Sequence, residues 1–125
     1  MDSVRISIPG RMPGMNEIVD AACTHPMVYR EMKREHTGSV ILAAQISRVE
    51  PVESAVLRYH WYEPDRRRDL DNIAAAAKFV NDGLVAAKIL KSDGWHHIKG
   101  IEHRFYVDKE SPRVEVELIV EEDEV

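Results

Sequence analysis

The sequence has only one cysteine, Cys23, among its 125 residues. A single cysteine excludes a disulfide within the chain and a zinc site built on several cysteines, and it fits a reducing cytoplasm. The chain does not open with a basic region followed by an apolar core, so we expect no signal peptide. No apolar run approaches the roughly 20 residues of a membrane span. We therefore expect a cytoplasmic protein with no membrane partner.

Internal repeats and low-complexity linkers are also missing, so we expect one domain covering residues 1–125. A hydrophobic content of 44% and a charged content of 31% are typical of a globular chain rather than a disordered one. The formal net charge of −5 disfavours nucleic acid at face value. Residues 121–124 contribute four of the acids, however, and without them the balance is −1. The charge leaves a DNA partner open, and we expect the acidic end to be a solvated tail.

Alternating apolar residues predict four strands, and helical spacing predicts three helices. The expected strands cover residues 4–8, 55–61, 101–107 and 114–120, and the expected helices cover 17–22, 27–48 and 71–87. Asn16 is the expected N-cap of the first helix, and Gly38 is a possible break in the second. We predict that the last two strands, joined through Pro112, form a β-hairpin. The expected fold is a single α+β domain with a small mixed β-sheet, helices packed against it, and the order β-α-α-β-α-β-β.

The third helix separates into two faces when it is drawn at about 100° per residue. Asp71, Lys78 and Asp82 lie on one side of it. The apolar residues gather on the opposite side: Ile73, Ala77, Val80, Leu84 and Ala87. The polar stripe is therefore predicted to face away from the core.

Asp69 and Asp71 flank Leu70 where a basic loop becomes this helix. In an extended segment, residues two apart point the same way, so both carboxylates can reach one ion. Neighbouring carboxylates repel each other unless a cation lies between them, and oxygen-rich clusters suit Mg²⁺. The alternative is a structural role, in which the aspartates only cap the helix and form ion pairs.

Three features near this pair favour metal-dependent phosphodiester chemistry. Arg66, Arg67 and Arg68 precede it and would attract phosphate. Asn72 could orient a carboxylate or a water from behind. Asp93 returns on a turn that could lie beside the helix start, if the turn folds back. A Mg²⁺ ion held there would polarise a phosphoryl oxygen and lower the pKa of a bound water.

Further along the chain, each candidate has a functional and a structural interpretation. Lys78 could orient the water or offset charge in the transition state, or it could be a surface lysine paired with Asp82. Lys33 and Arg34 could contact phosphates or belong to a solvated helix face. Trp95 could pack over the site or stack on a base.

His103 lies on the apolar face of its expected strand. No cysteine partner and no His-x3-His spacing accompany it, so zinc is disfavoured. We predict a hydrogen-bonded core histidine.

The segment from Arg68 to Asn72, the helix with its inward lysine and the Asp82-Gly83-Leu84 step, and the later Asp93 together resemble the RusA-like family of Holliday-junction resolvases. Many members of this family come from bacteriophages and prophages. The N-terminal segments 8–10 and 13–17 and the closing pair of strands resemble it as well.

This resemblance implies a small homodimeric endonuclease that uses Mg²⁺ or Mn²⁺ and cuts branched DNA symmetrically inside a bacterial cell. The family's essential aspartates would correspond to Asp69, Asp71 and Asp93, and its catalytic lysine to Lys78. Here the lysine comes three residues later than in the family's prototype, which we interpret as a three-residue insertion in the alanine run.

The sequence thus predicts a metal-dependent endodeoxyribonuclease acting on branched DNA. Asp69, Asp71 and Asp93 would hold the metal, and Lys78 would assist. Asn72 and Asp82 would support that shell, while the cations at positions 33, 34 and 66–68 would contact DNA. The rivals are a non-catalytic branched-DNA-binding protein with the same fold and a globular adaptor whose aspartates only cap and pair.

Overall fold

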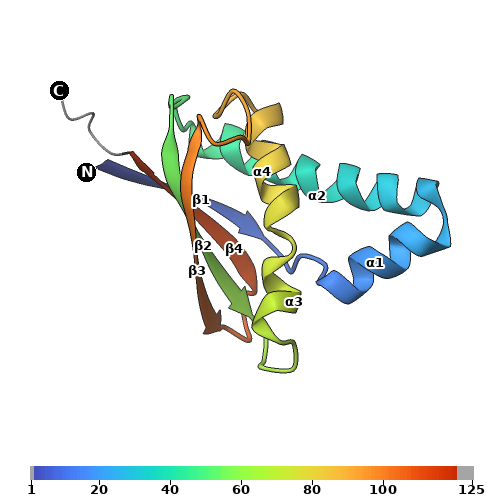
Figure 1. The fold of residues 1–125 in the computed structure, drawn as a ribbon. Coiled ribbons are helices and arrows are strands. Elements are labelled where there is room, and N and C mark those ends of the chain that lie inside the picture. Colours follow the sequence, from blue (N-terminus) through green and yellow to red (C-terminus); the bar gives the residue numbers. More distant parts are fainter. Residues whose placement is uncertain (1, 121–125) are drawn as a thin grey trace.

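The computed structural model describes residues 2–120, which form a small single-domain α+β fold. A four-stranded mixed sheet carries helices on one face, and α1 projects from it together with the first half of α2 (Figure 1). The elements are β1 (Asp2–Pro9), α1 (Met15–Thr24), α2 (Pro26–Ser47), β2 (Ala55–Glu63), α3 (Leu70–Ala74), α4 (Ala77–Ala86), β3 (Ile98–Val107) and β4 (Arg113–Val120). The predicted α+β class and small mixed sheet are confirmed for this part of the chain. The acidic tail that we expect to be solvated lies outside the described residues.

None of the helices within residues 2–120 combines the length and the apolar character needed to cross a bilayer.

The strand order in the sheet is β1-β4-β2-β3. β4 runs antiparallel to both of its neighbours, whereas β2 and β3 are parallel. The predicted β-hairpin of the last two strands is therefore wrong, because β2 lies between them. α3 and α4 form the crossover that a parallel pair requires, and β4 then fills the gap between β1 and β2. Alternation identifies strands, but it does not say which strands are neighbours.

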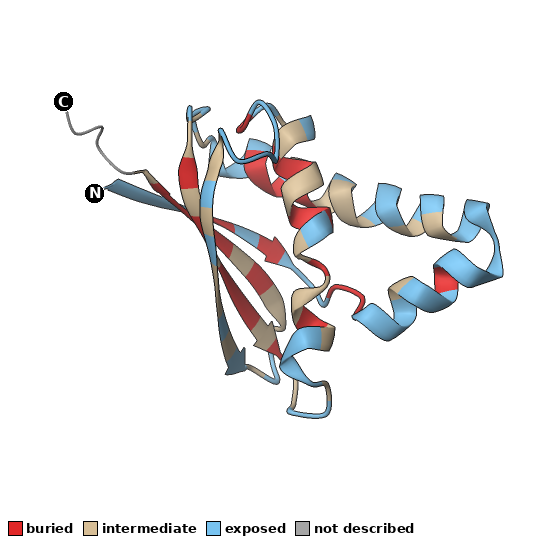
Figure 2. Ribbon diagram, viewed as in Figure 1, coloured by how far each residue is buried: buried red, intermediate tan, exposed pale blue. Residues whose placement is uncertain are grey.

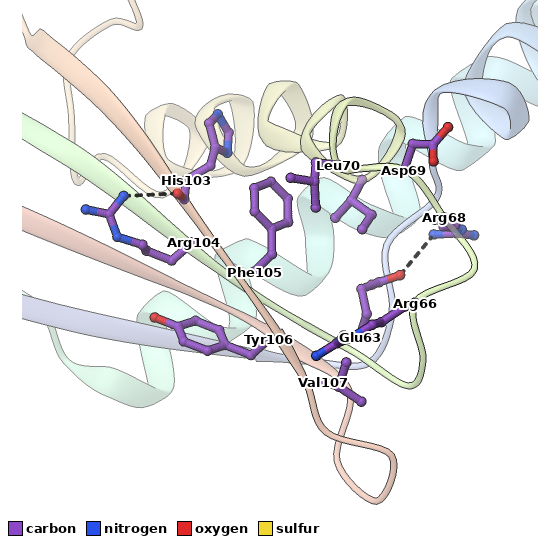
Figure 3. Close-up of a pocket in the computed structure, with 11 residues that line it drawn as sticks. Glu63, Arg66, Arg68, Asp69, Leu70, His103, Arg104, Phe105, Tyr106 and Val107 are labelled. Carbon is purple, nitrogen blue, oxygen red and sulfur yellow. Dashed lines mark hydrogen bonds and ion pairs between the residues drawn. The ribbon is translucent and has the colours of Figure 1, made fainter.

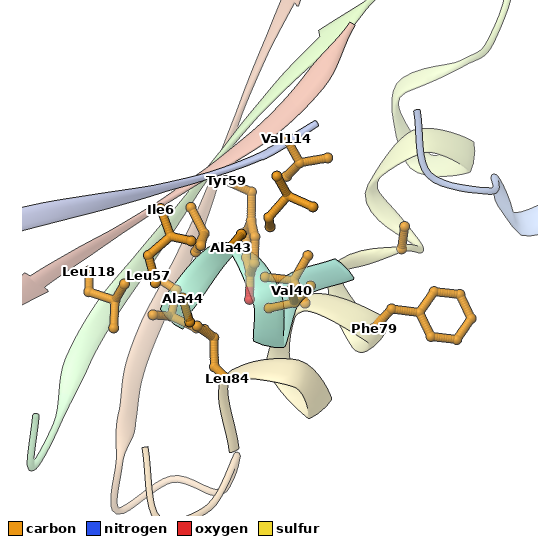
Figure 4. Close-up of a cluster of buried hydrophobic side chains, with 14 of the residues drawn as sticks. Ile6, Val40, Ala43, Ala44, Leu57, Tyr59, Phe79, Leu84, Val114 and Leu118 are labelled. Atoms are coloured by element: carbon orange, nitrogen blue, oxygen red, sulfur yellow. The ribbon is translucent and has the colours of Figure 1, made fainter. Parts of the chain in front are cut away.

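The hydrophobic core lies between the sheet and the α2 and α4 helices (Figure 4). Its largest fully buried side chains include Trp61, Tyr59, Phe79, Ile6, Leu57, Leu84, Leu118 and Val40. α2 continues without a break through Gly38, so the interruption considered there does not occur. Gly83 allows α4 to approach α2 closely, because a Cβ built on it would lie 2.5 Å from the Val40 Cβ.

The predicted continuous helix after Asp71 is wrong, since Ala75 and Ala76 form a turn between α3 and α4. The Ala76 amide donates to the Ile73 carbonyl at 3.3 Å, and the Phe79 amide donates to the Ala76 carbonyl at 3.0 Å. These i→i+3 bonds advance the chain by about 120° per residue instead of about 100°. In a regular helix Phe79 would lie outside the apolar stripe, whereas here it is fully buried. Core packing has overridden the helix propensity of alanine.

The start of α1 depends on Gly14 rather than on Asn16, which corrects the expected N-cap. The backbone N–H of Asn16 instead donates a hydrogen bond to the Oδ1 of Asn72 in α3, at 3.1 Å. A Cβ on Gly14 would lie 2.6 Å from the same oxygen. The loop and α3 are therefore in close contact at Gly14, and a larger residue there would displace the Asn72 side chain.

No helix of residues 2–120 covers the other face of the sheet, and buried residues alternate with half-buried ones along β2 and β4 (Figure 2). Its cations and acids neutralise each other: Arg5, Arg58, Arg104 and Arg113 pair with Glu102, Asp108, Glu115 and Glu117. Beneath them the buried His60 bonds the Tyr106 hydroxyl at 2.9 Å and the Glu117 carboxylate at 3.0 Å. The hydrogen bond from His60 lowers the pKa of Glu117. Because its arginines are paired, this face is poorly suited to phosphate.

Candidate functional site

Asp69 and Asp71 stand at the start of α3, where the loop that follows β2 turns into helix. Asp69 occupies the N-cap position with an extended backbone (φ −69°, ψ 156°), yet its side chain makes no capping hydrogen bond. Among the described residues, the Asp71 carboxylate accepts a hydrogen bond only from the backbone N–H of Asn72, at 2.9 Å. Both residues are exposed, and among residues 2–120 neither takes part in an ion pair. Within residues 2–120, the structure thus presents two carboxylates, two residues apart in the sequence, that no ion pair compensates.

The parallel pair of β2 and β3 explains why these carboxylates are displayed. β2 ends at Glu63, and α3 begins the crossover that leads to β3. In open sheets with parallel strands, ligand sites commonly lie outside the carboxyl ends of the strands. Asp69 and Asp71 follow such an end.

Arg68 acts as an internal brace in the loop before α3. Its guanidinium donates to the Met12 carbonyl at 2.9 Å, contacts the Glu17 carboxylate, and lies 3.9 Å from Glu63. The buried Glu63 also receives two bonds from Arg11, at 3.1 and 2.9 Å. These contacts tie the loop to the segment before α1. Sequence reasoning did not identify this brace, because its acids lie in other elements.

The two preceding arginines differ from this brace. Arg66 and Arg67 are exposed, and Arg67 contacts only the nearby Asp65, with Nε 3.7 Å from the carboxylate. Both side chains therefore face solvent, and Arg66 lines the same groove as Asp69. On α2, Arg34 is exposed, whereas Lys33 lies 3.5 Å from the Asp82 carboxylate.

Asn72 joins α3 to α1 through the bond to the Asn16 amide described above. Its carbonyl oxygen points to the start of α1. The structure therefore gives this side chain a role in fixing where α3 sits.

Lys78 lies in a second cluster with Asp82 and Asp93. Its ammonium is 3.2 Å from Asp82 Oδ1 and 3.5 Å from Asp93 Oδ2. The Asp82 carboxylate raises the pKa of Lys78, with Asp93 contributing in the same direction. Lys78 is therefore protonated at neutral pH, so it can donate a hydrogen bond or offset negative charge but cannot take up a proton.

Within residues 2–120, no three side chains of His, Cys, Asp or Glu gather closely enough to hold a metal ion together. The structure brings Asp93 to Lys78 and does not bring it to Asp69 and Asp71 as a set of three. Mg²⁺ commonly binds proteins through one or two carboxylates and completes its shell with waters and substrate phosphate. The oxygen ligands of Asp69 and Asp71 fit that requirement without a third residue.

A groove of about 600 Å³ opens directly beside Asp69 (Figure 3). It is lined by Glu63, Arg66, Arg68, Asp69, Leu70, Ile73 and the β3 residues from His103 to Val107. The predictions missed this groove, because its two sides are about 35 residues apart in sequence and meet only through the parallel pairing of β2 and β3.

His103 makes the predicted hydrogen bond, but it is half-buried at this groove and is not part of the hydrophobic core. The Trp61 indole N–H donates to its Nδ1 at 2.9 Å, and its ring stacks on Tyr59 with the centroids 4.9 Å apart. An indole can only donate, so the neutral imidazole carries its proton on Nε2. Burial lowers the pKa of His103. Trp95, by contrast, is 95% exposed, so its packing interpretation is wrong, and stacking on a base stays a prediction.

No protein-family model matches the chain, and no curated protein is significantly similar to it in sequence. Fold and site together define a small α+β domain with an uncompensated acidic pair after a parallel strand.

Proposed function

We propose that this protein is a metal-dependent endodeoxyribonuclease that cleaves branched DNA such as Holliday junctions in recombination and repair. The observation that carries the proposal is the exposed pair Asp69 and Asp71, which forms no ion pair within residues 2–120 and follows the exposed Arg66 and Arg67 in the loop. An acidic pair without a counter-ion is electrostatically costly unless it binds a cation. The RusA-like sequence motif around the same residues supports this interpretation.

The metal would be Mg²⁺, or Mn²⁺ in its place, and its ligands would be Asp69 and Asp71. Asp93 would be the third ligand and would exchange its contact with Lys78 for the ion. When bound, the ion supplies a Lewis acid for the phosphoryl oxygen. The Asp93 carboxylate is half exposed on its turn and contacts only a lysine side chain in its ion pair, which leaves it a candidate ligand. Asn72 would support the site by fixing α3 against α1.

Lys78 would offset negative charge on the phosphate in the transition state. Its raised pKa fits this role and excludes general-base work at neutral pH. Asp82 would orient the ammonium through the contact at 3.2 Å.

DNA would be held chiefly by exposed cations near the acidic pair. Arg66 and Arg67 are the main candidates, with Lys33 and Arg34 on α2 as further contacts, and Arg68 would act by bracing the loop. For each phosphate contact, the affinity falls by about 0.9 log units when the salt concentration rises tenfold. Replacing Arg66 or Arg67 should therefore flatten the salt dependence of binding.

A homodimer would allow two such sites to cut two strands of one junction in a bacterial cytoplasm, with phage or prophage as the origin of the protein. Light scattering would check the mass, and a monomer under cutting conditions would contradict symmetric cleavage.

The deciding experiment incubates the purified protein with a synthetic four-way junction and Mg²⁺. Wild-type protein should cut, and Asp71→Asn should cut about 100-fold more slowly, because a metal ion contributes several kcal/mol and each 1.4 kcal/mol is tenfold. Binding of the junction should persist or improve in Asp71→Asn, since a negative charge is removed near phosphate. Asp20→Asn on α1 is the matched control, because it removes the same charge from an exposed helical position elsewhere.

The second candidate is a non-catalytic branched-DNA-binding protein. It is favoured by the placement of Asp93 beside Lys78 rather than in a group of three carboxylates. Junction binding without cleavage in Mg²⁺ and in Mn²⁺ would establish it. Failure to bind junction DNA at all would leave the adaptor interpretation.

A further inference from the structure

The groove beside Asp69 combines two kinds of surface. Leu70, Ile73 and Phe105 provide apolar walls, and Arg66 adds a guanidinium group at its margin (Figure 3). Its volume of about 600 Å³ falls in the range of about 300–1,000 Å³ that is usual for small-ligand sites. It is therefore large enough for one nucleotide.

Leu70 is the least expected of these residues. It lies between Asp69 and Asp71 and is 58% exposed, so it does little for the core. An apolar side chain at this place gives one wall of the groove a hydrophobic surface within one residue of each carboxylate. A nucleobase can rest on such a surface, because the flat face of each of the four bases is apolar.

We propose that this groove takes one unpaired nucleotide of branched DNA, with the base against Leu70 and Phe105 and the phosphates towards Arg66. The inference rests on the proposed function and extends it to the feature of DNA that is recognised. A base in an intact duplex is stacked and paired, and extracting it costs free energy, whereas a base at a branch point is already free. The groove would thereby favour branched DNA over duplex.

The alternative occupant is a protein strand, because β3 is an edge of the sheet and its free backbone groups could pair with another chain. Charge complementarity favours the nucleotide. Arg66 is exposed at the groove and offers a cation to phosphate, whereas Arg104 lies on the other side of β3 and is paired with Glu102 (Figure 3). The groove is also continuous with Asp69, a proposed metal ligand.

The test is a double-mutant cycle on affinity, measured by fluorescence anisotropy in EDTA so that no cutting occurs. One DNA is a fork with a single unpaired nucleotide at its branch, and the other has an abasic residue at that position. Wild-type protein should bind the abasic fork roughly tenfold more weakly, since stacking of one base is worth this order of affinity. Leu70→Ala should bind the intact fork roughly tenfold more weakly and should no longer distinguish the two DNAs.

Leu42→Ala is the matched control, because Leu42 is also a helical leucine that is 58% exposed, and it lies on α2 away from the groove. It should keep the wild-type affinity and the abasic penalty. An equal abasic penalty in wild type and Leu70→Ala would overturn the groove proposal, and cleavage by wild type in Mg²⁺ would show that the nuclease proposal survives.

Two other outcomes would also overturn the groove proposal. A lower oligomeric mass for Leu70→Ala, with its discrimination against the abasic fork intact, would identify the groove as a contact between copies of the chain. Wild-type protein that neither binds nor cuts either fork would refute both proposals together.

Discussion

The start of α3 and the outer side of α4 carry the same kinds of residue in opposite electrostatic states. At the start of α3, Asp69 and Asp71 are exposed and, within residues 2–120, form no ion pair. Along α4, Asp82 contacts both Lys33 and Lys78, and Lys78 also contacts Asp93. We propose that the first region binds a cation from outside, whereas the second has its cations in the chain itself.

This difference teaches that proximity in a sequence motif does not make residues equivalent. The turn at Ala75 and Ala76 separates the two regions. An acid beside a lysine contributes little binding energy for metal, because its charge is already neutralised, while an unpaired acid repels its neighbour until a cation arrives. Whether the two regions act as one site is the question that the following substitutions address.

The largest effect is expected from the aspartates themselves. Asp69→Asn should lower the rate of junction cleavage by about 100-fold, because several kcal/mol of metal stabilisation is lost. If Asp93 joins the same ion, Asp93→Asn should show an equal loss. Single-turnover rates over a range of Mg²⁺ concentrations would measure both variants. A loss smaller than tenfold in Asp93→Asn would assign this residue to the Lys78 pair alone and would keep the two regions apart.

Gly83→Ala tests whether α4 is held in place by its contact with α2. The added Cβ would lie 2.5 Å from the Val40 Cβ, so we expect a loss of about 1–3 kcal/mol in the free energy of unfolding. Denaturant unfolding would measure it. Gly38→Ala is the control, since a Cβ there meets nothing within 4 Å, and it should be neutral or stabilising. Equal stability of the two variants would contradict the close crossing.

Lys78→Ala separates the catalytic from the structural interpretation of the α4 cluster. Loss of the exposed ion pair should cost about 0.5 kcal/mol of stability or less. Loss of charge stabilisation in the transition state should lower cleavage about 10- to 100-fold, which lies at or below the cost of removing a preorganised donor. Lys78→Arg should recover part of the activity, and Lys109→Ala, an exposed lysine in the β3–β4 connection, should change nothing. Unchanged cleavage in Lys78→Ala would leave the lysine as a surface partner of Asp82.

Asn72→Ala tests how firmly the start of α3 is attached to α1. Removing the acceptor of the Asn16 amide should cost about 1 kcal/mol, as loss of a helix cap does. Thermal unfolding would report this cost, and metal affinity measured by calorimetry should fall only slightly. A collapse of metal affinity without a change in stability would instead make Asn72 a direct participant in the metal site.

The smallest effect concerns His103 at the groove and appears as pH dependence. Burial lowers the pKa of His103, so the folded state binds this proton less readily than the unfolded state. Stability should be constant above the ordinary value of about 6.5 and should fall as pH drops from there towards the folded pKa. His103→Phe should flatten this part of the curve of Tm against pH, while the unpaired Trp61 N–H lowers Tm at every pH. An unchanged slope would mean that other groups produce the pH dependence.

Several parts of the fold were predictable because they depend on local pattern. The alternation of Ile6 and Ile8 with polar residues identified β1. Helical spacing around Val40 located α2, which runs through Gly38. The hairpin prediction failed because alternation is the same whichever strand is the neighbour. The continuous third helix failed because alanine is compatible with either geometry, and burial of Phe79 decided between them.

For the site, the sequence alone determined which groups are available. It placed Asp69 and Asp71 at a helix start after a basic loop, because their spacing and the loop composition are local features. Only the tertiary structure decided which charged groups of the candidate site are paired. Arg68 is turned inward to Glu17 and Glu63, Asp93 is neutralised by Lys78, and a groove forms beside Asp69. These relations join elements far apart in the chain, so they follow from the order in which the strands pair and not from any one segment.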